Sequence, residues 1–298
     1  MFDFLMPLSD LLRAEPIVFI TVSVIFGLLV GSFLNVVIHR LPIMMENTEE
    51  AYFQQRQALA ANLSETELTA LPQAPTYNIV TPRSACPKCG HKIGALENIP
   101  IISYLILGGK CKGCKTKISM RYPLIEALTG ALIGAAAYVY GYSNATLFIF
   151  AFIFALIALT FIDLDTFLLP DDIVLPLLWL GLLFNLNTGF TDLKSAVIGA
   201  VAGYMILWLV FWAFKLIRGK EGMGYGDFKL LAAIGAWFGW QMLPAVILLS
   251  SVAGSLIGIY FMLFKGKNQD YAIPFGPYLA LGGIAALFFG QQLASFYL

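Results

Sequence analysis

Apolar runs long enough to cross a bilayer are the feature that most constrains how this chain folds. A membrane-spanning helix needs about 20 mostly apolar residues, and runs of this kind recur along most of the sequence. Eight such runs are predicted to be helices, near residues 17–38, 123–141, 145–162, 172–188, 194–216, 227–240, 242–264 and 274–296. We therefore expect an all-α polytopic membrane protein with about eight transmembrane helices.

Composition agrees with this expectation. Hydrophobic residues make up 59% of the chain and charged residues only 12%, whereas soluble domains carry roughly 25% charged residues. The net charge of zero leaves no basic footprint of the kind that binds nucleic acid. The expected surroundings are therefore membrane lipid, with no nucleic-acid partner.

The first apolar run is expected to stay in the protein as a transmembrane helix. No basic region precedes residues 17–38, the run is too long for the core of a signal peptide, and no obvious cleavage site follows it.

The distribution of basic residues predicts the orientation. With the N-terminus outside, the segments that face the cytoplasm hold 16 of the 18 lysines and arginines, and only Arg13 and Lys194 lie outside. Cytoplasmic loops are enriched in these residues. The cytoplasmic segments are then 39–122, 163–171, 215–229 and 265–273.

This topology divides the chain into three parts. Residues 1–39 form an N-terminal segment with the first helix, 40–122 a cytoplasmic domain, and 123–298 a seven-helix membrane domain. Within the cytoplasmic domain, residues 43–82 are polar and acid-rich, and we expect a solvated surface hairpin there with no catalytic role. Ser64 to Glu67 has the form of a capping box and predicts a short helix that ends before Pro72.

Four cysteines in two pairs indicate a metal site in the cytoplasmic domain. The pairs are Cys86-x-x-Cys89 and Cys111-x-x-Cys114, with 21 residues between them, and paired C-x-x-C motifs at about this spacing bind zinc tetrahedrally. A site with four cysteine ligands has no open position, so the predicted zinc is structural. A redox dithiol and free thiols are the alternatives, and His91 is expected to be a bystander.

Aspartates gather on the same predicted cytoplasmic face. Asp163 ends the third membrane helix and Asp227 opens the sixth, so both lie next to apolar runs. Ionisable residues within a membrane domain are functional candidates, and two carboxyl groups that share a proton can activate water in an aspartyl protease. Asp171 and Asp172 follow Pro170 and are expected to cap the fourth helix. Spacing alone does not choose Asp163 over Asp165.

Asp227 ends a glycine-rich stretch, Gly222-Met-Gly-Tyr-Gly-Asp227. Alternating glycines permit close backbone approach, and the stretch is not a dinucleotide loop because no βαβ unit surrounds it. The predicted sixth helix is also short, about 21 Å against a hydrocarbon core of about 30 Å, which places Asp227 below the bilayer surface. Helix dipoles predict that Asp163, at a C-terminus, carries the shared proton and that Asp227 is ionised.

Taken together, these stretches resemble the bacterial type IV prepilin peptidases, which are bifunctional leader peptidases and N-methyltransferases. The resemblance covers nearly the whole chain. It rests on these motifs: Gly31 to Asn35, Cys86 to Ile93, Asn98 to Pro100, Ser103-Tyr104, Ser119 to Glu126, Phe161 to Asp172, Gly222 to Asp227, and Pro274 to Tyr278.

The resemblance implies a site and a second activity. Asp163 and Asp227 would be the catalytic pair, and the four cysteines would hold zinc. After cleaving the leaders of prepilins and pseudopilins, the enzyme would methylate the new N-terminus with S-adenosylmethionine. It would serve type IV pili and type II secretion from the bacterial inner membrane. Gly109 and Lys110 are candidates for the methyl-donor site, and Glu126 is either a partner of Arg121 or part of a site.

Two other functions stay open at this point. One is a presenilin-like intramembrane protease, which also has a glycine–aspartate motif, and the other is an ion-coupled transporter whose aspartates line an ion path. The segment that holds the two cysteine pairs, Cys86 to Cys114, here called the cysteine module, favours the prepilin peptidase, and so does Pro274 to Tyr278. A transporter would be expected to show inverted repeats, and none is detected in the sequence.

Overall fold

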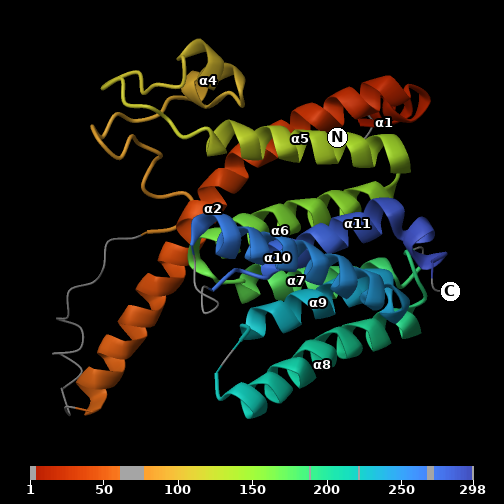
Figure 1. Ribbon diagram of the computed structural model, residues 1–298. Coiled ribbons are helices and arrows are strands. Elements are labelled where there is room, and N and C mark those ends of the chain that lie inside the picture. Colours follow the sequence, from red (N-terminus) through yellow and green to blue (C-terminus); the bar gives the residue numbers. More distant parts are fainter. Residues whose placement is uncertain (1–4, 61–76, 188, 221, 267–271, 297–298) are drawn as a thin grey trace. The chain divides into compact units, whose positions relative to one another are not determined.

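The computed structural model describes the chain except residues 1–4, 61–76, 188, 221, 267–271 and 297–298 (Figure 1). Apart from two isolated bridges, the secondary structure of the described residues is entirely helical. The elements are α1 (Leu5–Ala14), α2 (Pro16–Ala60), η1 (Ala95–Asn98), α4 (Ile102–Ile106), α5 (Arg121–Tyr140), α6 (Asn144–Thr166), α7 (Asp171–Phe184), α8 (Leu193–Arg218), α9 (Tyr225–Phe238), η2 (Trp240–Met242), α10 (Leu243–Lys265) and α11 (Gly276–Ala294).

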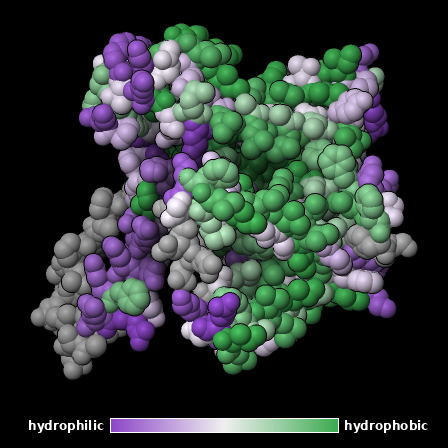
Figure 2. All heavy atoms as spheres, viewed as in Figure 1, coloured by the Kyte–Doolittle hydropathy of each residue, from purple (hydrophilic) through white to green (hydrophobic). Residues whose placement is uncertain are grey.

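Helices occupy all eight predicted ranges, but they are not all of spanning length. Within the described residues, five helices are long and apolar enough to cross a membrane: α2, α5, α6, α8, and η2 continuous with α10. Helices α7 and α9 have only 14 residues each. Hydrophobic residues cover most of the visible face of the helical bundle (Figure 2), as expected for helices that lie in a membrane.

The polar region after the first membrane segment differs from the prediction. Helix α2 does not end near residue 38 but continues to Ala60, so the hairpin expected to begin at residue 43 is wrong for the part that is described. Its glutamates, glutamines, alanines and arginine are good helix formers, and the side chains from 46 to 57 are solvated as expected. The predicted capping-box helix lies outside the described residues. Helix α1 was not predicted.

The described chain forms two compact units. One comprises residues 1–27 with 129–298, and the other comprises residues 28–128. In the larger unit α9 is the central helix, packing against α7, α8, α10 and α11. Every α9 side chain from Asp227 to Phe238 except Lys229 is buried.

Aromatic side chains and backbone hydrogen bonds hold the C-terminal end of α9. The indole of Trp237 stacks on Phe184 and donates a hydrogen bond to the carbonyl of Leu177, at 2.9 Å. Asn185 donates to the carbonyls of Ala236 and Trp237, at 2.8 and 2.9 Å. These bonds connect the end of α7 to the end of α9, so the two short helices are held as a pair.

Glycines bring α8 and α9 into backbone contact. A Cβ atom on Gly235 would collide with the carbonyl group of Gly199, and one on Gly199 would collide with that of Gly235. A Cβ on Gly203 would lie 2.6 Å from the carbonyl oxygen of Leu231. Small residues at helix interfaces allow such close packing within membranes, and here they set how closely α9 approaches α8.

We expect Gly235→Ala to destabilise the larger unit. The added methyl group has only backbone to displace, and overpacking of this kind costs about 1–3 kcal/mol. The thermal unfolding midpoint of the full-length protein in detergent should fall. Gly290→Ala in α11 is the matched control, because its Cβ would meet only Met242 Cε at 3.7 Å. Equal midpoints for the two variants would contradict the close contact.

Candidate active site and cysteine cluster

Asp163 lies in the last turn of α6 and is 4% exposed. The helix ends at Phe167, which adopts a left-handed conformation with φ of 57° and donates its N–H to the carbonyl of Asp163. The carboxyl oxygen Oδ2 of Asp163 accepts a hydrogen bond from the N–H of Gly276, at 2.9 Å. The start of α11 is therefore fixed against the end of α6.

Asp227 lies in the first turn of α9 and is 7% exposed. Its backbone N–H donates to the carbonyl of Gly224, at 3.3 Å, which closes a turn within the glycine stretch. Its Oδ1 atom is buried and has no hydrogen-bond partner among the described residues. A buried carboxyl oxygen without a partner is costly, so this atom points to a function rather than to stability.

Asp163 and Asp227 lie near each other in the fold. Their carboxyl groups are close enough to interact electrostatically, although 64 positions separate them in the sequence. The expected placement of Asp163 at a helix C-terminus and Asp227 at a helix N-terminus is confirmed. Both lie in the larger unit, where α11 packs against α6 and α9.

Two glycines and a leucine bring the segments around the aspartates together. A Cβ on Gly226 would lie 2.8 Å from Leu169 Cβ. A Cβ on Gly276 would lie 2.7 Å from Asp163 Oδ2 and 3.0 Å from Leu169 Cδ2. Sequence reasoning gave Leu169 and Gly276 no role. Both lie inside motifs that carry the family resemblance, but only the fold shows that Leu169 packs against Gly276.

The neighbouring aspartates lie outside this pair. Asp165 is exposed. Asp171 binds Lys229 through both carboxyl oxygens at 2.7 Å, an ion pair that joins the starts of α7 and α9. The expectation that Asp171 and Asp172 cap α7 is wrong in detail, because Pro170 is the N-cap and the aspartates occupy the first turn. The negative charges of these aspartates still interact favourably with the helix dipole.

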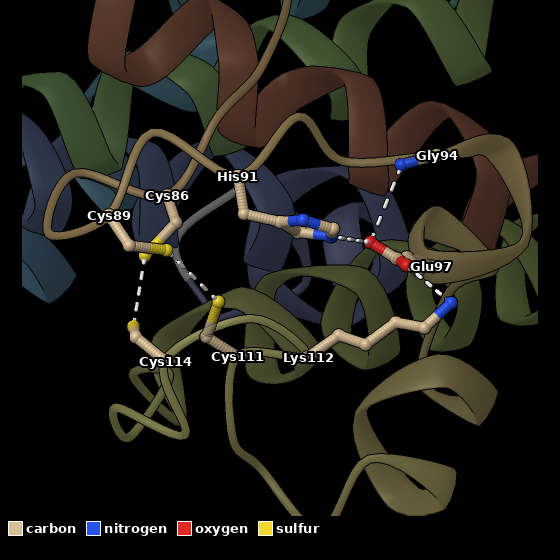
Figure 3. A network of polar contacts seen from close by, with 8 residues as sticks. All are labelled: Cys86, Cys89, His91, Gly94, Glu97, Cys111, Lys112 and Cys114. Atoms are coloured by element: carbon tan, nitrogen blue, oxygen red, sulfur yellow. Dashed lines mark hydrogen bonds and ion pairs between the residues drawn. The ribbon is translucent and has the colours of Figure 1, made fainter.

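The four cysteines converge in the smaller unit (Figure 3). Their sulfur atoms all lie within 4.8 Å of one another, with 3.8 Å between Cys86 and Cys114 and 3.9 Å between Cys89 and Cys111. A tetrahedron with zinc–sulfur bonds of about 2.3 Å has sulfur–sulfur edges of about 3.8 Å. The four thiols therefore fit a zinc ion.

Each cysteine pair sits on a hairpin of the same design. In the first, Gly90 donates to the carbonyl of Cys86, and an isolated bridge joins Ala85 to Lys92. In the second, Lys115 donates to the carbonyl of Cys111, and a bridge joins Lys110 to Lys117. Gly90 and Lys115, which follow each second cysteine directly, both have positive φ. The two hairpins thus present their sulfurs in equivalent ways.

One cysteine is readily ionised. The hydroxyl of Thr116, 3.3 Å from Cys114 Sγ, and the Thr116 backbone lower the pKa of the Cys114 thiol to about 6. This environment favours the thiolate form of Cys114, which is the metal-binding form.

Glu97 connects the two hairpins beside the sulfur cluster (Figure 3). Its Oε2 lies 2.9 Å from His91 Nε2 in the first hairpin, and its Oε1 lies 3.1 Å from Lys112 Nζ in the second. The hydrogen bond to His91, followed by that to Lys112, lowers the pKa of Glu97. His91 therefore contacts Glu97, and the described metal-binding group consists of the four cysteines.

The candidates for the methyl-donor site have structural contacts of their own. Gly109 has φ of 65°, and a Cβ there would lie 2.8 Å from Tyr104 Oη, so the backbone alone requires glycine. Lys110 is exposed. Glu126 is buried and accepts a hydrogen bond from the N–H of Ile101, at 2.8 Å. A role for Gly109 and Lys110 in methyl-donor binding stays a prediction.

Known protein families and curated relatives match nearly the whole chain. The family model described as the bacterial peptidase A24 N-terminal domain matches residues 25–140, and that of the type IV leader peptidase family matches residues 150–259. No solved structure matches the chain.

Curated bacterial relatives are similar along nearly their full length. Proteins named prepilin leader peptidase/N-methyltransferase are 51% identical in Aeromonas hydrophila and 50% identical in Pseudomonas aeruginosa, each with 98% of both chains covered. A third, from Stutzerimonas stutzeri, is 50% identical with 97% of both chains covered. With two family models matched in sequence order and half of all residues shared, the chain belongs to the type IV leader peptidase family, the bacterial enzymes named prepilin leader peptidase/N-methyltransferases.

Proposed function

We propose that this enzyme cleaves the leaders of type IV prepilins and pseudopilins on the cytoplasmic side of the membrane. It then methylates the new N-terminal residue with S-adenosylmethionine. One observation carries the proteolytic half: two buried carboxyl groups, Asp163 and Asp227, interact with each other beside the backbone N–H of Gly276. The names of the relatives support the substrate and the second activity.

In the proposed mechanism the two aspartates share one proton. The ionised carboxylate draws a proton from a water molecule that attacks the scissile carbonyl, and the protonated carboxyl donates a hydrogen bond to the carbonyl oxygen. Charge repulsion between the groups splits their titration, so the two steps belong to the pair. Helix dipoles favour the proton on Asp163, whereas the Gly276 N–H favours negative charge there; the order of protonation stays a prediction.

The orientation follows from the basic residues. We place the N-terminus in the periplasm of the bacterial inner membrane, and Asp163 and Asp227 on the cytoplasmic side. The C-terminal end of α6 and the N-terminal end of α9 then lie at that surface. The length of α9, 14 residues, supports a site slightly below it.

A structural zinc on Cys86, Cys89, Cys111 and Cys114 completes the proposal. When bound, the metal supplies a cross-link between the two hairpins and has no open coordination position for catalysis. Family membership favours the leader peptidase over the presenilin-like protease and the transporter. We look for the methyl-donor site near Gly109 and Lys110.

Cleavage should depend on both aspartates. Purified full-length protein, mixed with a prepilin and S-adenosylmethionine, should release the leader and give a methylated N-terminus, read by mass spectrometry. Asp163→Asn and Asp227→Asn should each lower the cleavage rate by about 10³-fold or more, because each removes one member of the acid–base pair.

Asp172→Asn is the matched control, because Asp172 is exposed in the first turn of α7. This variant enzyme should cleave the prepilin at the normal rate. Cleavage by either active-site variant at more than a tenth of the normal rate would rule out the two-aspartate mechanism. Cleavage without methylation would remove the second activity alone.

The cleavage rate should show a bell-shaped dependence on pH. At low pH both carboxyl groups are protonated and no base remains, and at high pH both are ionised and no acid remains. Single-turnover rates at saturating prepilin, measured from acidic to alkaline pH, test this. A rate that only rises with pH would show that a single ionised group suffices.

Zinc should be lost when a cysteine is changed but retained when His91 is changed. Elemental analysis of the purified full-length protein should find one zinc ion per chain, and Cys111→Ser should lose it because a tetrahedral site needs all four ligands. Hydrogen exchange should then rise in residues 84–118. His91→Gln, the control, should keep the metal; its loss there would place the histidine among the ligands.

A further inference from the structure

The connection between the two cysteine hairpins exposes large apolar side chains. In α4, which lies in this connection, Ile102 is 54% exposed, Leu105 69% and Ile106 79%. Leu96 in η1 and Met120 before α5 are also exposed. The three α4 side chains, here called the apolar patch, are three and four residues apart and so lie on one face of the helix. All five residues belong to the smaller unit. Apolar groups gathered in this way on a domain expected to face water mark an interaction surface.

Hydrogen bonds attach α4 to α5 and to the segment that precedes α5. Ile101, the residue before α4, donates its N–H to Glu126 Oε2 at 2.8 Å. It does so with φ of 60°, which is a strained conformation for a β-branched residue. Tyr104 Oη donates to the carbonyl of Ile118, at 3.4 Å.

This attachment sets the depth of α4. Helix α5 has 20 residues, so it is about 30 Å long and needs its whole length to cross the hydrocarbon core. It therefore begins at the edge of the core, at Arg121. Glu126 lies five residues further, about 7.5 Å along the helix, and its side chain leans back towards the helix N-terminus. The segment that it holds lies at the boundary between lipid headgroups and acyl chains.

The net charge of the segment that carries the patch matches an anionic lipid surface. Residues 83–121 contain eight basic residues and one acidic residue, Glu97, which is bound to His91 and Lys112. Four thiolates with one zinc ion would contribute a net charge of −2, so the module stays basic. Apolar side chains beside lysines are typical of segments that lie in the membrane interface, and juxtamembrane lysines are attracted to anionic lipids.

We propose that the apolar patch inserts into the cytoplasmic leaflet and that lysines of the same segment bind anionic lipid headgroups. The cysteine module is thereby held down on the bilayer through α4 as well as through its covalent connections. The partner is the lipid bilayer itself. A segment of prepilin is the competing occupant, and the experiment below distinguishes the two.

Photo-crosslinking of the full-length protein tests the proposal. Benzoylphenylalanine replaces Leu105, and the protein is placed in nanodiscs of phosphatidylglycerol and phosphatidylethanolamine, irradiated, digested and analysed by mass spectrometry for lipid adducts. Retained zinc shows that the variant is folded. The matched control carries the same amino acid at Phe53 of α2, an exposed apolar position that follows Glu49 and Glu50.

We expect several-fold more lipid adduct at position 105 than at position 53, and a lower yield at 105 in neutral phosphatidylcholine. Equal yields at the two positions would overturn membrane insertion. A yield that does not change in the neutral bilayer would overturn the assignment of anionic headgroups. Adducts that move from lipid to an added prepilin would identify the patch as a substrate surface instead.

Discussion

Burial of two carboxyl groups within one helical bundle is the constraint on which this structure depends. Carboxylates near each other in a poorly solvated site repel each other and lose hydration, so the arrangement persists only if the surrounding helices are held firmly. Helix α9 supplies that support. It is too short to be a candidate membrane span, yet its buried side chains pack against four neighbouring helices. Glycine contacts with α8 and hydrogen bonds from α7 fix its position.

The glycines near the aspartates serve close approach rather than flexibility. Gly226 and Gly276 both pack where a side chain would strike Leu169, and Gly276 also presents its N–H to Asp163. Three segments far apart in the sequence are thereby packed around a single leucine. Asp227 Oδ1 is buried there without a hydrogen-bond partner among the described residues, as the proposed water activation requires.

The cysteine module follows a different principle. It has little apolar interior, and Cys111 is the one cysteine of the four that is buried. Its two hairpins are held by backbone bridges and by Glu97 between His91 and Lys112, and the geometry of their four sulfur atoms fits a zinc ion. Its exposed apolar residues are not a defect of folding if the bilayer covers them. A small domain of this kind is stabilised by what it binds.

The sequence by itself determined the helical class, the helix in each apolar run, the cysteine cluster and the positions of Asp163 and Asp227 at opposite helix ends. These features depend on composition and on local patterns, which need no knowledge of the fold. The hairpin predicted for residues 43–60 was wrong, because a polar segment without glycine or proline continues a helix as readily as it forms a loop. Only the tertiary structure decided that Gly276 binds Asp163, that Leu169 packs on two glycines and that Glu126 holds Ile101. Each of these contacts joins residues that are distant in the sequence. Such contacts depend on how the helices pack, and a local sequence pattern does not contain that information.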